Sequence, residues 1–382
     1  MQSTCPKKDI CGSCSWSPIP YEKQLMQKLS DINGSFAIKE LDLRCESILP
    51  SPVTEHYRNR MDFAIDYQGH VGLKEKGKWW KVIDGHGCFL ADEQIDELFK
   101  AVRDWVKTCD LSFYDRKAHT GLLRYAVIRS TTLEQTMVNI VTSSSRHGEE
   151  PRRSGRGDEV IQKILALAHN DGLTTLIWSQ NSTITDVSYG DILETLTGPG
   201  FIEEEISGHR YRISPNAFFQ TNSHGAALLL KTVEEFCGDL SGKTLLDLYC
   251  GSGFFSVALA PRASRTVGVE MVPEAIVDAR VNAELNHVTI EFHDAKTEDF
   301  DWTSLGADVV ILDPPRSGMH DKALVDILAN PPNHIVYVSC NYKNFAREMI
   351  QLQKIYHIDA MRAIDLFPHT PHVELVTKLT RK

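Results

Sequence analysis

From about residue 240 onward, short apolar runs alternate with amphipathic segments, and this alternation limits the possible folds more than any other feature. Continuous apolar runs of strand length, divided by helical segments, are typical of βα units around a parallel sheet. The runs are KTLLDLY, RTVGVE, VTIEF, DVVILDPP, HIVYVSC, IDAMRAIDLF and VELVTKL. The last two are joined only by PHTPH, which is too short for a crossover helix and therefore predicts an antiparallel hairpin.

The middle of the chain, roughly residues 40–205, has a different pattern. YAVIRSTTLEQTMVNIVT alternates around a turn at residues 131–134, which indicates a mostly antiparallel α+β module. We therefore predict an α/β fold in three parts. An amino-terminal segment with several cysteines (1–90) packs with the central α+β domain (40–205), and a parallel-sheet domain of the class I, Rossmann-like methyltransferase type occupies residues 206–382.

Composition narrows the class of protein. With 42% hydrophobic and 24% charged residues over 382 positions, the chain has the balance of a globular protein. Its longest apolar stretches are strand-sized, well short of the ~20 residues that span a membrane. The amino terminus, MQSTCPKKDICGSC, lacks the apolar core of a signal peptide. We expect a cytoplasmic monomer that does not associate with membranes.

The net charge of -10 gives no general attraction to nucleic acid, so RNA binding would use local basic patches. KEKGKWWK (74–81) places four lysines around two tryptophans, which could combine phosphate contacts with stacking surfaces. PRRSGRG (151–157) is a short basic loop. Each segment is equally consistent with a solvated hairpin tip.

A glycine-rich turn follows the first strand of the parallel-sheet domain, in DLYCGSGFFS. Gly251 there permits a tight turn and close approach of the backbone to a ligand. Glu270 ends the next strand, where a carboxylate can accept both ribose hydroxyls, and Asp313 follows a later strand. The turn lacks GxGxxG spacing and a P-loop lysine, so a dinucleotide or a triphosphate is poorly supported. Each turn alone would be ordinary, but together they favour an adenosine cofactor without phosphate, and S-adenosylmethionine fits best.

Cys340 ends the strand HIVYVSC, at the sheet edge where open α/β sheets bind ligands. Most buried thiols only pack, but a thiol at this edge is a candidate nucleophile, and its reactivity is helped if a helix starting near Asn341 lowers its pKa. Carbon 5 of uracil attacks a methyl group readily once a thiolate has added to carbon 6, and a base must then remove the carbon 5 proton. Glu374 is the candidate base, with His369 and His372 as competitors.

Four ordered motifs, DLYCGSGFFS, LDPPRSG, VSCN and FPHTPHVE, preceded by NAFFQTN, resemble the bacterial RNA 5-methyluridine methyltransferases over most of the chain. The resemblance implies that Cys340 is the nucleophile, that Glu374 is the base and that Phe218 stacks on the extruded uracil. It also implies that S-adenosylmethionine is held, beside Gly251, by Gln220, Tyr249, Glu270 and Asp313.

The sequence departs from some relatives at two positions. Phe254 stands where many carry a small or polar residue, and Tyr342 stands where a proline often follows the asparagine. Both leave the reactive groups in place and bear only on the expected shape of the cofactor pocket.

The chain has nine cysteines, and this odd count without a secretion signal favours metal ligation or catalysis over disulfides. Cys5, Cys11 and Cys14 are spaced as C-x5-C-x2-C, and Cys88 lies in DGHGCFLAD. Four thiolates can bind zinc or an iron–sulfur cluster, and the spacing does not decide between them. The family resemblance implies a structural [4Fe-4S] cluster on these four residues, because ribosomal members carry the set. Packing roles are expected for Cys45, Cys109, Cys237 and Cys250, with Cys250 near the cofactor.

The resemblance implies that the substrate is a uridine in an RNA loop. The base must be extruded, because stacking hides carbon 6 from a nucleophile. The layout, without a β-barrel appendage before the cysteines, is most similar to the enzymes that act on a 23S ribosomal RNA hairpin, and transfer RNA is the alternative. A cytosine-5 methyltransferase would share the thiolate chemistry. A non-catalytic iron–sulfur RNA-binding protein would have no use for Cys340 beside Glu374.

Overall fold

The structure, a computed structural model, describes residues 5–144 and 156–382. The chain divides into two compact units, each of which is formed by separated segments. The first unit comprises Met1–Pro18, Glu55–Glu205 and Arg212–Asn216. The second unit comprises Ile19–Thr54, Ile206–Tyr211 and Ala217–Lys382.

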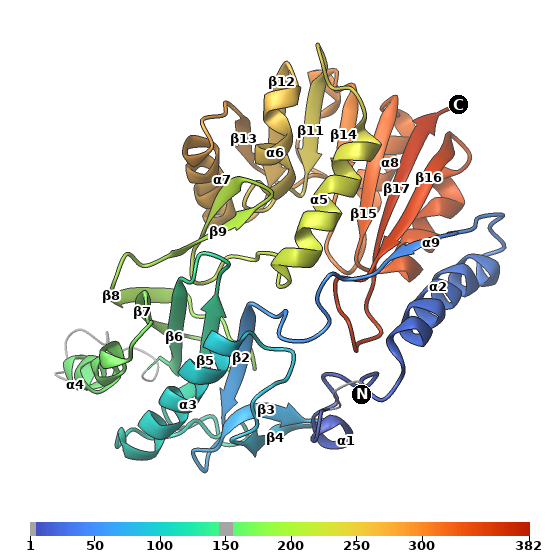
Figure 1. Ribbon diagram of the computed structural model, residues 1–382. Coiled ribbons are helices and arrows are strands. Elements are labelled where there is room, and N and C mark those ends of the chain that lie inside the picture. The colour runs from blue at the N-terminus through green and yellow to red at the C-terminus, as the bar shows by residue number, and fades with distance from the viewer. Residues whose placement is uncertain (1–4, 145–155) are drawn as a thin grey trace. The chain divides into compact units, whose positions relative to one another are not determined.

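The second unit is built around an eight-stranded sheet with the order β1-β16-β17-β15-β14-β11-β12-β13 (Figure 1). Neighbouring strands from β11 to β15 run parallel, whereas β17 lies antiparallel between β15 and β16. The predicted parallel sheet and its antiparallel hairpin are therefore confirmed. The strands are β1 (Ile48–Leu49), β11 (Thr244–Leu248), β12 (Arg265–Glu270), β13 (Glu291–Asp294), β14 (Val309–Leu312), β15 (His334–Ser339), β16 (Tyr356–Ile364) and β17 (Glu374–Arg381).

Helices pack on this sheet through apolar side chains. In one buried core, Phe36 of α2 lies edge-on to Phe345 of α9, with ring centroids 6.1 Å apart. Phe345 in turn meets Tyr337 of β15 at 5.2 Å. This core supports the strands whose carboxyl ends carry the candidate site. The helices are α2 (Tyr21–Ile38), α5 (Ser223–Cys237), α6 (Phe254–Leu259), α7 (Pro273–Leu285), α8 (Asp321–Ala329) and α9 (Tyr342–Leu352), with short 3-10 turns η3 (Ala260–Arg262) and η4 (Thr303–Leu305).

Residues 19–54 belong to the second unit, which differs from the predicted division into segments 1–90 and 40–205. Helix α2 contributes Ile32 and Phe36 to the core of the sheet, and β1 pairs in parallel with β16. The sequence of α2 gives little sign of this, because its buried face also carries Gln24 and Lys28. Their partners lie more than 300 positions away in the chain, beyond the reach of local pattern analysis.

The first unit contains a seven-stranded sheet with the order β4-β3-β2-β5-β6-β7-β8 (Figure 1). Its pairs are antiparallel except β6–β7, and β5 and β6 form the predicted hairpin. This agrees with the mostly antiparallel α+β module expected from the sequence. The strands are β2 (Arg60–Ile65), β3 (Val71–Glu75), β4 (Lys78–Asp84), β5 (Leu123–Ser130), β6 (Thr136–Ser143), β7 (Thr175–Asn181) and β8 (Ile192–Thr197).

The remaining elements are four helical segments of the first unit and a second hairpin. The first unit contains α1 (Lys8–Cys11), α3 (Glu93–Thr108), α4 (Arg156–Ile164) and η2 (Leu165–His169), and the chain then forms the hairpin β9 (Ile202–Ile206) and β10 (His209–Ile213). The basic segment PRRSGRG lies for the most part outside the described residues. In the described part of the chain, every helix is too short or too polar to cross a membrane.

Candidate active site

Cys340 and Glu374 lie at the same edge of the second unit's sheet because of the register between two strands. β15 ends at Ser339 and β17 begins at Glu374, and Ser339 pairs with Leu375 in the antiparallel ladder. The residue after Ser339 is therefore placed beside the residue before Leu375. In the parallel ladder between β14 and β15, Leu312 pairs with Tyr337, so Asp313 emerges at this edge as well. The sheet thus brings together all three groups that the sequence singled out for chemistry.

Cys340 is the most accessible thiol of the chain. The nine cysteines all lie in the described residues, and each is free; eight are buried, whereas Cys340 is partly exposed. This distinguishes it from packing cysteines such as Cys45, Cys109 and Cys237, which fit the structural role expected of them. A partly exposed thiol at a ligand-binding edge is available to a substrate.

The pKa of the Cys340 thiol is raised to about 12, chiefly by burial and then by the carboxyl groups of Glu374 and Asp313. The condition that helix α9 lowers this pKa is therefore not met in the free protein. Asn341 caps that helix, since its side chain accepts the N–H of Lys343 at 3.2 Å. Arg316 is the neighbouring cation that acts in the opposite direction, but it does not outweigh two acids and the desolvation. The thiol is therefore protonated at neutral pH before any ligand binds.

Glu374 has the properties of a general base. Burial raises the pKa of its carboxyl group to about 7, close to the pH at which a base works best. Burial and the nearby Glu374 and Asp247 also raise the pKa of Asp313. Acids in one low-dielectric site oppose each other's ionisation, which is a common feature of functional sites.

The two competing histidines have other partners. His369 is buried: its backbone N–H donates to Gln24 Oε1 at 2.8 Å, and its Nδ1 lies 3.1 Å from Gln24 Nε2. His372 Nδ1 lies 3.3 Å from a guanidinium nitrogen of Arg316. Neither histidine is among the groups that shift the pKa of Cys340, whereas Glu374 is. Glu374 is thus the better placed of the three candidate bases.

Glu270 organises the glycine-rich turn after β11. Its two carboxylate oxygens accept the N–H of Gly251 at 3.1 Å and the N–H of Val272 at 2.8 Å. Because each carboxylate oxygen has two lone pairs, capacity remains for a pair of hydroxyl donors. Tyr249 and Gly251 both have positive φ angles, 65° and 56°, which turn the chain sharply at the end of the strand. No atom lies within 4 Å of where a Cβ of Gly251 would be, so the space above the turn is open.

The surroundings of this turn suit an adenosine. Met271 and Val272, which follow Glu270 directly, are 54% and 45% exposed and offer apolar surface beside the carboxylate. Cys250 lies close to Gly268, where an added Cβ would come within 3.0 Å of its sulfur. It therefore packs beneath the turn. An acid with free acceptor capacity, an open glycine turn and apolar surface fit the expected nucleoside part of S-adenosylmethionine.

Two residues of the site were not singled out by the sequence analysis. Asp247 of β11 is fully buried, with a carboxylate oxygen that accepts the N–H of Ser256 at 3.0 Å, and burial raises its pKa to about 7. Arg316 follows the DPP turn, and its carbonyl accepts the side-chain amides of Asn341 and Asn344 at 3.0 and 2.8 Å. Both residues lie inside motifs that mark the site, Asp247 in DLYCGSGFFS and Arg316 in LDPPRSG. Only the fold reveals that they face the other acids and the thiol.

The segment NAFFQTN carries two neighbouring aromatic rings, one buried and one exposed. Phe219 is buried against Tyr211 and Phe254, at centroid distances of 5.4 and 5.9 Å. Phe218 is 74% exposed, and Gln220 is partly buried. Phe254, one of the two departures from the family pattern, therefore belongs to this aromatic core. An exposed ring next to an anchored one is a suitable stacking surface for a base.

The loop before Glu374 is held from both sides. On α2, Lys28 Nζ donates to Asp365 at 2.6 Å and to the carbonyl of Phe367 at 3.0 Å. Asn222, the N-cap of α5, donates to the carbonyl of Leu366 at 2.8 Å. These contacts fix the position of the hairpin that presents Glu374.

The four amino-terminal cysteines come together in the first unit. Cys5, Cys11, Cys14 and Cys88 are all buried. The pKa of Cys14 is strongly raised by burial and by its neighbours Cys5, Cys88 and Cys11, which shows that the sulfurs interact. Nevertheless, among the residues that the structure describes, no group of three or more His, Cys, Asp or Glu side chains has the arrangement of a metal site. The fold assembles the predicted residues without itself demonstrating a cluster.

Comparisons with known proteins identify the relatives of this chain. The family model described as tRNA (Uracil-5-)-methyltransferase matches residues 202–382. A Pyrococcus furiosus tRNA (uracil(54)-C(5))-methyltransferase is 38% identical over 375 residues, which cover 97% of this chain and 83% of the relative. An RNA methyltransferase of Caldanaerobacter subterraneus is 35% identical over 400 residues, with 100% and 85% covered. The crystal structure of Pyrococcus abyssi tRNA (uracil-54, C5)-methyltransferase in complex with S-adenosyl-L-homocysteine has a TM-score of 0.79 at 35% identity, covering 96% of this chain and 86% of that one.

Proposed function

The chain belongs to the tRNA (uracil-5-)-methyltransferase family, and on this premise we propose that it methylates carbon 5 of one uridine through a covalent bond between Cys340 and carbon 6 of the base. Its activity class is that of an S-adenosylmethionine-dependent RNA uracil-5 methyltransferase. The observation that carries the proposed chemistry is the strand register that sets Cys340 beside Glu374 and within reach of Asp313.

The proposed reaction balances with these residues. The Cys340 thiolate forms a bond to carbon 6, and the electron pair of the ring double bond moves toward the carbonyl oxygen as an enolate. Carbon 5 then forms a bond to the methyl group of S-adenosylmethionine while the bond between that methyl group and the sulfonium sulfur breaks, which leaves S-adenosylhomocysteine. Glu374 removes the proton from carbon 5, the double bond re-forms, and the bond between sulfur and carbon 6 breaks. The thiolate is thereby regenerated.

The protonation states of the two residues suit different steps. Glu374, with a pKa of about 7, is substantially ionised at neutral pH and can accept a proton. Cys340, with a pKa of about 12, rests as the thiol and must release its proton to solvent when substrate and cofactor enter. A cationic sulfonium placed near Asp313 would favour that loss, because a nearby positive charge stabilises the thiolate.

Residues at the glycine turn would hold the cofactor. We assign Glu270 to the ribose hydroxyls and the open turn at Gly251 to close backbone contact. Tyr249 and Asp313 follow the ends of β11 and β14, and we assign them, together with Gln220 of the NAFFQTN segment, to the remainder of the molecule. Phe218, with its exposed ring, would stack on the extruded uracil.

We propose a transfer RNA uridine as the substrate. The named relatives from three Pyrococcus species, 37–38% identical, are tRNA (uracil(54)-C(5))-methyltransferases, and this chain covers 83–85% of their lengths. The other predicted substrate, a 23S ribosomal RNA hairpin, has no comparable support among these relatives. The cytosine-5 alternative and the non-catalytic alternative both lose ground, because the family acts on uracil.

We further propose that Cys5, Cys11, Cys14 and Cys88 hold a [4Fe-4S] cluster. All four thiols are buried and free, and the pKa of Cys14 is raised by burial and by its neighbours Cys5, Cys88 and Cys11, which places the four sulfurs in one small region and supports the assignment. The cluster would serve structure alone, since uracil methylation transfers no electrons. An ultraviolet-visible spectrum of anaerobically purified protein tests it: a cluster gives broad visible absorption, whereas zinc gives none.

Methyl transfer from labelled S-adenosylmethionine tests the substrate assignment. Transfer RNA and ribosomal RNA are taken from cells that lack this protein, and each is incubated with the purified protein. The modified nucleosides are then identified by mass spectrometry. The proposal predicts 5-methyluridine in transfer RNA. Label confined to ribosomal RNA would overturn the choice of RNA, and label in cytidine would overturn the chemistry.

A further inference from the structure

The lysines of the β3–β4 hairpin are mostly committed to neighbouring acids. Lys78 and Lys81 both pair with Glu75, the latter at 2.8 Å, and Lys74 pairs with Asp186. Segment KEKGKWWK therefore offers phosphate less free positive charge than its composition indicates. Its tryptophans remain available, since Trp79 and Trp80 are 49% and 37% exposed.

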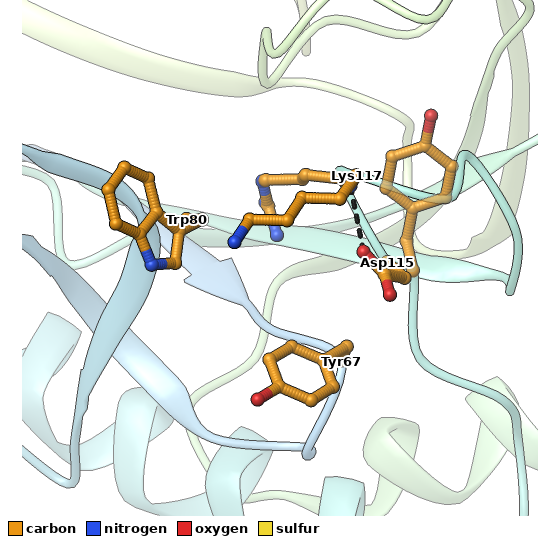
Figure 2. A pocket seen from close by; sticks show the side chains of 6 residues that line it. Tyr67, Trp80, Asp115 and Lys117 are labelled. Atoms are coloured by element: carbon orange, nitrogen blue, oxygen red, sulfur yellow. Dashed lines mark hydrogen bonds between the residues drawn. The ribbon is translucent and has the colours of Figure 1, made fainter.

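A cavity of about 200 Å³ lies beside Trp80 in the first unit (Figure 2). Aromatic rings from three separate segments face it, and the ammonium group of Lys117 lies 4.9 Å from the ring centre of Trp80. No ion pair to Lys117 occurs in the described part of the chain, so this cation is free for a ligand. The cavity is lined by Tyr67, Trp80, Tyr114, Asp115, Arg116 and Lys117.

Two parts of the cavity wall, Tyr114 and the turn that carries Tyr67, are anchored by neighbouring groups. Tyr114 is buried, its hydroxyl lies 3.1 Å from His119 Nδ1, and the guanidinium of Arg124 stacks on its ring at 4.4 Å. The Tyr67 turn is closed by Asp66, whose carboxylate accepts the N–H groups of the turn at 2.9 and 3.1 Å. A fixed aromatic cavity is preorganised for a flat ligand, which reduces the entropic cost of binding.

The charged groups that line the cavity differ in how far their hydrogen-bonding atoms are already used within the protein. Arg116 is buried, and each of its three nitrogens donates a hydrogen bond within the protein, to Asp186 at 2.8 Å and to the carbonyls of Ile65 and Arg124 at 2.7 and 3.1 Å. Asp115 uses Oδ1 to accept the N–H groups of Lys117 and Ala118, at 2.7 and 3.2 Å. Asp115 lines the cavity, and its other carboxylate oxygen has lone pairs with which it can accept a further hydrogen bond. A ligand would therefore need a flat ring with an N–H donor and a negative charge outside the cavity.

We propose that this cavity binds one unpaired nucleotide of the RNA substrate, with the base against Trp80 and Tyr67, a base N–H donor toward Asp115 and the phosphate toward Lys117. The inference rests on the proposed function, which supplies RNA as the ligand. Base stacking on an aromatic ring contributes more than an exposed cation–π contact, so a base can displace the ammonium from the Trp80 ring. The displaced ammonium is then free for the phosphate. A cavity below the ~300 Å³ typical of drug-sized ligands suits a single base.

The test compares variants of the cavity with matched neighbours outside it. Trp80→Ala and Lys117→Ala are measured against Trp79→Ala and Lys78→Ala, because Trp79 does not line the cavity and Lys78 is paired with Glu75. All four sites are on the surface, and circular dichroism verifies folding. Binding of a transfer RNA transcript is measured by filter retention across a range of salt concentrations. The Cys340→Ala background removes covalent capture and turnover.

Trp80→Ala should weaken binding roughly 5- to 100-fold, and Lys117→Ala should lower the slope of log affinity against log salt by about 1. The control variants should bind like the parent. Equal affinities for cavity and control variants would overturn the inference. Methyl transfer is assayed separately with Cys340 intact. If methylation is normal but the cavity variants bind RNA as well as the controls do, only the nucleotide site is contradicted. If methylation is absent but the cavity variants bind RNA more weakly than the controls do, only the proposed reaction is contradicted.

Discussion

Lys28 of α2 and Asp365, at the end of β16, form an ion pair of 2.6 Å in which both side chains are fully buried. Burial lowers the pKa of the lysine, while the aspartate acts in the opposite direction. Lys28 also donates to the carbonyl of Phe367, and Asp365 accepts the N–H of the same residue at 3.1 Å. The pair therefore fixes the start of the loop that ends at Glu374.

Replacing Lys28 by Met should destabilise the second unit by about 3–5 kcal/mol, because it leaves a buried carboxylate without its partner. Unfolding in urea, monitored by hydrogen exchange of the amides in β16 and β17, measures the free energy of unfolding of that unit. Lys23→Met, at an exposed position of the same helix, is the control and should change stability by less than about 0.5 kcal/mol.

The double variant Lys28→Met, Asp365→Leu distinguishes a lost charge from lost packing. Removing both members of a buried pair is often nearly neutral, so the double variant should recover much of the stability lost in Lys28→Met. A double variant as unstable as the single one would show that the ion pair is not the source of the effect.

Alkylation of Cys340 by iodoacetamide should rise steeply with pH in the free protein. Its pKa is raised to about 12, so the reactive thiolate fraction should increase about tenfold per pH unit between about pH 7 and pH 9. Mass spectrometry of the labelled protein follows the rate, and Cys340→Ser shows the background from the buried thiols. A rate that levels off below pH 9 would mean that the thiol is already activated.

Glu374→Gln should slow the release of the methylated base rather than the first addition. The amide cannot take the carbon 5 proton, so a covalent RNA–protein species that already carries the methyl group should accumulate. Denaturing gel electrophoresis with labelled methyl donor detects it. With the native residue, release should slow as the pH falls through about 7, because the raised pKa leaves the carboxyl group protonated below that value. Release at the normal rate in Glu374→Gln would assign the base elsewhere.

Glu270→Ala should weaken S-adenosylmethionine binding about 10- to 100-fold, which corresponds to the loss of hydrogen bonds to a charged acceptor. Isothermal titration calorimetry measures the dissociation constant. Glu274→Ala, in the exposed first turn of α7, is the matched control and should bind normally. Unchanged affinity in Glu270→Ala would remove this carboxylate from the proposed cofactor site.

The sequence predicted the parallel sheet and the meeting of Cys340, Glu374 and Asp313, because parallel strands carry their carboxyl ends to one edge. It did not reveal that α2 belongs to that unit, since the partners of Gln24 and Lys28 are distant in the chain. The sequence also did not reveal that the pKa of Cys340 is raised, because burial and the two nearby acids that raise it are brought together only by the fold. Lys117 was missed for a related reason: it meets Trp80 only through the fold.

The most direct test of the central claim uses an RNA loop that carries 5-fluorouridine at the target position, with S-adenosylmethionine present. Fluorine cannot leave as a proton does, so the methylated adduct is trapped and its site is found by peptide mass spectrometry. The account predicts one adduct, on Cys340, and neither adduct nor methylation in Cys340→Ala. An adduct on another residue, or continued methylation by Cys340→Ala, would contradict it.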